Sequence, residues 1–121
     1  MITATINKSN QDTQPAGITA VLVRYSTPTY RFNANVDLVE YCEKFRVVFT
    51  QLGREVLYKT EDDMTFDGMT AQLKLTQEET ALFYPNQTIT MTVKFKFKSG
   101  EVPPEKEFLL LCKDTQVEEV L

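Results

Sequence analysis

The stretch Thr88-Ile89-Thr90-Met91-Thr92-Val93-Lys94-Phe95-Lys96-Phe97-Lys98 decides the fold class, because polar and apolar residues alternate along it without a break. Successive side chains of a β-strand point to opposite faces. One face of this strand would carry five apolar side chains, and the other would carry three threonines and three lysines. The pattern predicts a half-buried strand of an antiparallel sheet, in which Ile89, Met91, Val93, Phe95 and Phe97 face the core.

The rest of the chain repeats this pattern in short segments separated by turn residues. Strands are expected over 18–25, 29–36, 45–49, 55–59, 69–75 and 108–113. Gly53 supplies a hairpin turn, and Thr76 with Glu79 forms a capping box that predicts one short helix, ended by Pro85. We therefore predict an all-β fold, a single immunoglobulin-like antiparallel β-sandwich with one short helix and an extended N-terminal arm. An open barrel is the alternative fold, and the absence of a Cys-Trp-Cys spacing argues against a true antibody-type domain.

The predicted domain organisation follows from composition. Residues 1–16 are polar and end near Pro15, so they are expected to form an extended N-terminal arm, and residues 17–121 are expected to form the β-sandwich domain. The whole chain has 121 residues, which suits one domain. The N-terminus lacks a basic-then-apolar signal pattern, so we expect a protein that is made and used without secretion.

Charge and hydropathy bear on the partners. The net charge is −4, which argues against a nucleic-acid partner. No apolar run approaches the ~20 residues of a membrane-spanning helix, so no membrane partner is expected. These features leave proteins and small ligands as the candidate partners.

Few groups in the sequence can do chemistry. The chain has no histidine, which excludes Ser-His-Asp and Cys-His centres and an ordinary zinc site. Cys42 and Cys112 are expected to be reduced, mostly buried thiols, and a disulfide between them is the alternative. The acidic stretch 61–63, followed by Asp67-Gly68, suits either a calcium loop or a solvated turn, and we favour the turn because EF-hand spacing is absent. We therefore predict no enzyme, no metal and no cofactor.

Two segments are apolar on both faces of a strand. Val21 and Val23 alternate with Ala20 and Leu22, and a similar pattern recurs at the last strand. Such strands are either central strands covered by the helix or arm, or a partner surface. In the arm, alternating residues suit an edge strand added to a neighbouring subunit, with a frayed terminus as the alternative. The candidate assembly interface consists of Ile2, Ile6, Val21, Val23, Leu109 and Leu111.

Four short motifs follow one another in a recognisable order. They are Ser26-Thr27-Pro28-Thr29, Phe49-Thr50-Gln51, Asp67-Gly68 and Leu75-Thr76-Gln77-Glu78-Glu79-Thr80. Through them, residues 24–121 resemble small proteins of the structural gene modules of phages and prophages of Gram-positive bacteria. The chain also looks like the N-terminal β-sandwich domain of upper baseplate proteins of tailed phages. The polar arm, the extra strand before Arg24 and the Pro103-Pro104 turn depart from that pattern.

The resemblance implies a non-enzymatic bacteriophage virion structural protein, a tail or baseplate component with no catalytic residues. Its partners would be other phage structural proteins or further copies of itself, and its location would be the virion, assembled in the host cytoplasm. The alternative is a free-standing β-sandwich binding module for a carbohydrate or host-surface ligand. Such a module requires a row of exposed aromatic rings, whereas the chain has no tryptophan and five tyrosines dispersed along it. An enzyme is the third class, and the missing histidine disfavours it.

Overall fold

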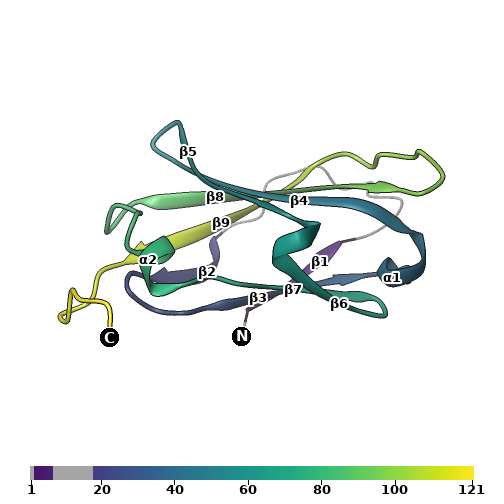
Figure 1. Cartoon of the computed structure of the whole chain (residues 1–121). Helices are drawn as coiled ribbons and strands as arrows, with labels where there is room; N and C mark the ends of the chain where they lie inside the picture. The colour runs from purple at the N-terminus through teal and green to yellow at the C-terminus, as the bar shows by residue number, and fades with distance from the viewer. Residues whose placement is uncertain (1, 7–17) are drawn as a thin grey trace.

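Two β-sheets pack face to face in the computed structural model of the chain, which describes residues 2–6 and 18–121 (Figure 1). The first sheet has four strands in the order β1-β3-β7-β6, and the second has five in the order β2-β9-β8-β4-β5. The predicted all-β sandwich is thereby confirmed.

The four-stranded sheet is built from short strands. Its members are β1 (Ile2–Ile6), β3 (Thr29–Ala34), β7 (Thr70–Lys74) and β6 (Met64–Asp67). Strand β7 pairs antiparallel with both β3 and β6, whereas β1 pairs parallel with β3. The sequence reading missed β6, because its residues follow the acidic stretch that was expected to be a turn.

The five-stranded sheet contains the two longest strands. Its members are β2 (Ile18–Val23), β9 (Lys106–Lys113), β8 (Thr88–Phe97), β4 (Cys42–Gln51) and β5 (Arg54–Thr60). All neighbours pair antiparallel except β2 and β9, which run parallel. Each N-terminal strand therefore joins a different sheet, and each does so in parallel.

The core lies between the sheets, and aromatic rings from both sheets interlock there. The Tyr30 ring lies 5.9 Å from that of Phe49, and the Phe32 ring lies 5.8 Å from that of Phe45. Contacts of this kind between tilted rings stabilise a core beyond the burial of apolar area. The predicted faces of β8 are confirmed, since Ile89, Met91, Val93, Phe95 and Phe97 are all buried while Lys94 and Lys98 are exposed.

Short helical segments connect the sheets. The capping box predicted at Thr76 and Glu79 is present and opens α2 (Gln77–Thr80). A second helix, α1 (Leu38–Tyr41), and a 3-10 turn, η1 (Glu61–Asp63), also occur, so the chain has more than the single helix predicted. Asp37 and Thr60 cap these two segments by accepting hydrogen bonds from backbone amides.

The N-terminal segment differs from the expectation of an extended arm. Residues 2–6 form β1 on the outer edge of β3 in the same chain, with Ile2 opposite Tyr30 and Ile6 opposite Ala34. The physical reason is that the edge of β3 offers unpaired backbone groups, and a strand of the same chain satisfies them without the cost of bringing two molecules together. The rest of the predicted arm, residues 7–16, lies outside the described residues.

Candidate assembly surface

Four of the six predicted interface residues lie together on the outer face of the five-stranded sheet. The parallel pairing of β2 with β9 sets Val21 beside Leu111 and Val23 beside Lys113. Val21 and Val23 are each 37% exposed, while Leu109 and Leu111 are half-buried. We call Val21, Val23, Leu109 and Leu111 the apolar stripe. Their inward neighbours Leu22, Leu110 and Cys112 are fully buried, so both faces of these strands are apolar, as predicted.

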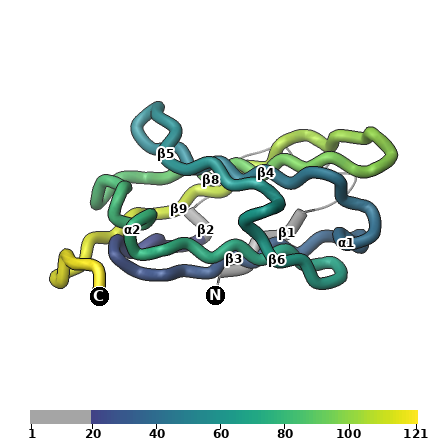
Figure 2. The backbone as a smooth tube through the Cα atoms, viewed as in Figure 1, coloured from purple at the N-terminus to yellow at the C-terminus, as the bar shows by residue number. Residues whose placement is uncertain are grey.

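The stripe lies at one edge of the sheet. Among the described strands, β2 is the first in the strand order and therefore an edge strand, whereas β9 is internal. Figure 2 shows β2 next to β9 and away from β5, which forms the opposite edge. On the other side of β9, Thr90 and Thr88 of β8 stand opposite Leu109 and Leu111. The apolar stripe is therefore bordered by threonine hydroxyls on the inner side and by a sheet edge on the outer side.

The remaining two predicted residues are on the other sheet. Ile2 and Ile6 belong to β1, which pairs with β3, so the structure does not bring them to the apolar stripe. The sequence placed all six residues in one contact because both segments alternate apolar residues. Alternation identifies a strand, but it does not say which sheet the strand joins.

Turn contacts hold the end of β2 in place. The Arg24 guanidinium forms an ion pair of 2.7 Å with Asp114, just beyond the end of β9, and its backbone N–H donates to the Lys113 carbonyl. The side-chain hydroxyl of Ser26 donates to the Val23 carbonyl at 2.6 Å, and the Ser26 backbone amide donates to the same oxygen. These contacts fix the register of β2 on β9 and occupy the last carbonyl of β2.

The buried side-chain amide of Gln51 positions the loop that leads into β8. This role was not predicted from the sequence. Gln51 is 2% exposed, and its Nε2 donates to the Tyr84 carbonyl at 2.8 Å and to the Gln87 carbonyl at 3.4 Å. Its Oε1 accepts from the Tyr84 N–H at 2.7 Å. One side chain thus satisfies three backbone groups of a loop, which explains a polar residue at an inward position of β4. A glutamine at an apolar position of an alternating strand was the available signal.

The thiols are separate and protonated. Cys42 and Cys112 are free cysteines, so they form no disulfide. Burial, with the nearby Glu61 carboxylate, raises the pKa of the Cys42 thiol to about 11. Burial also raises the pKa of the Cys112 thiol. Neither thiol is a nucleophile at neutral pH, because the reactive species is the thiolate.

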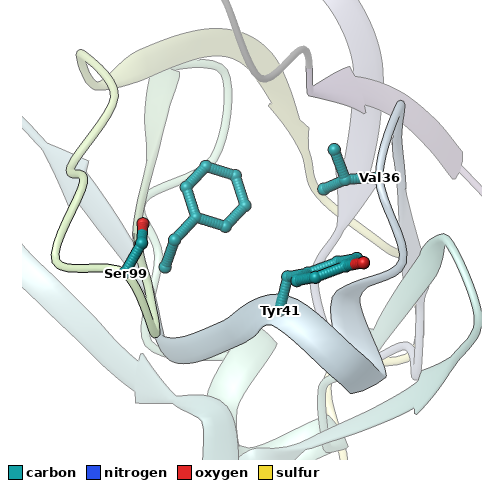
Figure 3. A pocket seen from close by; sticks show the side chains of 4 residues that line it. Val36, Tyr41 and Ser99 are labelled. Atoms are coloured by element: carbon teal, nitrogen blue, oxygen red, sulfur yellow. The ribbon is translucent and has the colours of Figure 1, made fainter.

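A cavity of about 390 Å³ lies at the end of the sandwich near α1. It is lined by Val36, Tyr41, Phe97 and Ser99, and Figure 3 shows the Tyr41 ring and the Ser99 hydroxyl on opposite sides of the space. Its size is within the range of small-ligand pockets. The lining residues that the structure describes include two hydroxyl groups and no carboxylate or amine.

No protein-family model matches the chain, and comparison with curated proteins found no relative. Within residues 2–6 and 18–121, no three Cys, Asp or Glu side chains gather where they could hold a metal ion. None of the helices formed by these residues has the length and hydropathy required to cross a membrane.

Proposed function

We propose that this chain is a non-enzymatic structural protein of a bacteriophage virion, a tail or baseplate component that acts by protein–protein assembly. The observation that carries the proposal is the apolar stripe at the edge of the five-stranded sheet. Val21 and Val23 are each 37% exposed on the outer face of this sheet, where Val21 lies beside Leu111. Apolar groups that remain together at a surface and are bordered by polar groups are typical of contacts with other proteins.

The chemistry of the chain supports an assembly role over catalysis. The chain has no histidine, and both thiols are held protonated at neutral pH. The carboxylates with lowered pKa values are engaged with cations of the same domain. Glu61, for example, contacts Arg46 and accepts from the Phe45 amide at 2.9 Å. A carboxylate occupied in this way stabilises the fold and is not poised to move protons.

The order of the strands supports the immunoglobulin-like assignment. Leaving aside the two N-terminal strands, β3-β7-β6 faces β9-β8-β4-β5, which is the order of the B-E-D and G-F-C-C′ strands of that fold. Upper baseplate proteins, which this chain resembles in its motifs, are expected to share the sandwich. We place the protein in the virion after assembly in the host cytoplasm, with other phage structural proteins or copies of itself as partners.

Detection in particles tests the proposal. Particles of the phage or induced prophage that encodes the chain are purified through a density gradient, and the chain is quantified by mass spectrometry relative to the major tail protein. We expect a fixed ratio that persists through a second gradient. A chain found only in the soluble lysate, at the level of a non-structural phage protein measured in parallel, would refute the virion role.

The cavity near α1 favours a second candidate function, a binding module for a carbohydrate or host-surface ligand. Tyr41 is 52% exposed at its rim and presents a ring face on which a sugar can stack. The other exposed tyrosines lie elsewhere, since Tyr58 is on β5 and Tyr84 is in the loop after α2. A glycan array compares the wild type with Tyr41→Ala, and Tyr84→Ala is the control. A signal lost only in Tyr41→Ala would favour the module over the structural role.

A further inference from the structure

The two edges of the five-stranded sheet differ in how they are protected against pairing. Strand β5 carries Arg54, Glu55 and Lys59, the charged residues that natural edge strands use to prevent association. Strand β2 reads Ile-Thr-Ala-Val-Leu-Val, with no charge, proline or glycine. A strand of six uncharged, mostly β-branched residues is the kind that pairs with another strand when left at an edge. Within the described residues, only β9 pairs with β2.

The backbone of β2 shows which groups face the open edge. The Arg24 amide donates to Lys113 of β9, and the backbone groups of successive strand residues point alternately to the two edges. The amide and carbonyl of Leu22 therefore face β9, and those of Val21 and Val23 face away from it. The Val23 carbonyl already accepts from Ser26, whereas no bond from another described residue reaches the Val21 N–H or C=O. Val21 is the residue of β2 that can exchange a complete pair of ladder bonds.

We infer that β2 pairs antiparallel with β2 of a second copy of this chain, about a two-fold axis through Val21. In this register each Val21 donates its N–H to the other's carbonyl, which is the hydrogen-bonded pair of an antiparallel ladder. The contact joins two five-stranded sheets into one of ten strands. A two-fold axis perpendicular to the sheet keeps both apolar stripes on the same face, so that they become one continuous surface.

The uncharged sequence of β2 favours a second copy as the occupant. In a two-fold contact the residue on the axis meets its own equivalent, so a charge at position 21 would repel itself. Arg24, the charged residue that follows the strand, forms an ion pair with Asp114 of its own chain. The inference deepens the proposed function by naming the partner, and its test uses the purified protein alone so that the two can fail separately.

Sedimentation of three proteins tests the pairing. We expect the wild type to have the dimer mass and Val21→Lys to have the monomer mass with an unchanged circular-dichroism spectrum, since residue 21 points outward. Tyr58→Lys is the matched control, because it places the same charge on the 52% exposed tyrosine of the opposite edge, and it should remain a dimer. Val21→Pro, which removes the N–H that faces the open edge and no hydrogen bond to β9, replaces Val21→Lys if the latter fails to fold.

Disulfide crosslinking tests the register. In a Cys42→Ser background, Val21→Cys should form a linked dimer with a copper–phenanthroline oxidant, because residues 21 of the two copies are opposite each other. Val23→Cys should not, because each residue 23 would stand opposite residue 19. A linked dimer of Val23→Cys alone would overturn the register. A monomeric wild type would overturn the pairing itself, even if the chain were found in particles, and so would a dimer that survives Val21→Lys.

Discussion

Replacing Gln51 with leucine should destabilise the fold through the loop that leads into β8. Leucine has a similar volume but no polar atoms, so the bonds of Gln51 to the Tyr84 N–H and C=O are both lost. The backbone groups of Tyr84 must then find water or remain unpaired. The bond to the Gln87 carbonyl, at 3.4 Å, is long and adds little.

The magnitude follows from the two short bonds. Each hydrogen bond contributes about 1 kcal/mol net, and a buried backbone group left without a partner costs about 1–3 kcal/mol. We therefore expect Gln51→Leu to lower the free energy of unfolding by about 2–4 kcal/mol. For a chain of 121 residues, this corresponds to a fall in Tm of roughly 10 °C.

Thermal and urea unfolding measure the effect, with Gln72→Leu as the control. Gln72 occupies an outward position of β7, so the same exchange there should change Tm by no more than about 2 °C. Gln51→Glu keeps the volume of the side chain but removes the amide group that donates to the Tyr84 and Gln87 carbonyls. Its carboxylate would face two carbonyl oxygens, which raises its pKa in the folded state, so this variant should regain stability as the pH falls through that raised pKa. A Gln51→Leu protein that melts with the wild type would refute the reasoning.

Four further outcomes are expected. Val93→Asp places an unpaired charge in the core and should lower the free energy of unfolding by several kcal/mol, and a melting curve equal to that of the wild type would contradict the register of β8. Partial burial raises the pKa of Glu79, but hydrogen bonds from Lys59 and the Thr76 amide outweigh it and hold the pKa below its usual value. The stability that Glu79 provides is therefore complete above the pKa of the unfolded state and is lost as the pH falls through the folded pKa. When Tm is measured at a series of pH values, its fall at acid pH should be smaller in Glu79→Gln than in the wild type. Because the pKa of Cys42 lies at about 11 instead of 9.0, its thiolate fraction at pH 8 is about 100-fold lower, and alkylation followed by mass spectrometry should be slower than for free cysteine by that order, unless local opening exposes the thiol. Deleting residues 1–6 removes β1 from the edge of β3 and should lower Tm without changing the oligomeric state measured by sedimentation. A loss of the dimer would instead place the contact on β1.

The sequence alone determined the features that depend on neighbours along the chain. The unbroken alternation over 88–98 set which face of β8 is buried, because side-chain direction in a strand has a period of two. The capping box at Thr76 and the turn at Gly53 were readable for the same reason, since a few adjacent residues form each of them. The two apolar faces of β2 and β9 were visible as well.

Tertiary structure decided which segments meet. Alternation cannot distinguish the sheet that β1 joins from the one that β2 joins, so the sequence placed Ile2 and Val21 in one contact while the fold separates them. Partners far apart in the chain also give Gln51 its role, because the loop at Tyr84 lies 33 residues away. Among the described residues, the open backbone of Val21 depends on three features at once: β2 is an edge strand, β9 takes the groups of Leu22, and Ser26 occupies the Val23 carbonyl. Strand pairing over long separations is governed by the packing of the whole domain, and a local pattern carries no record of it.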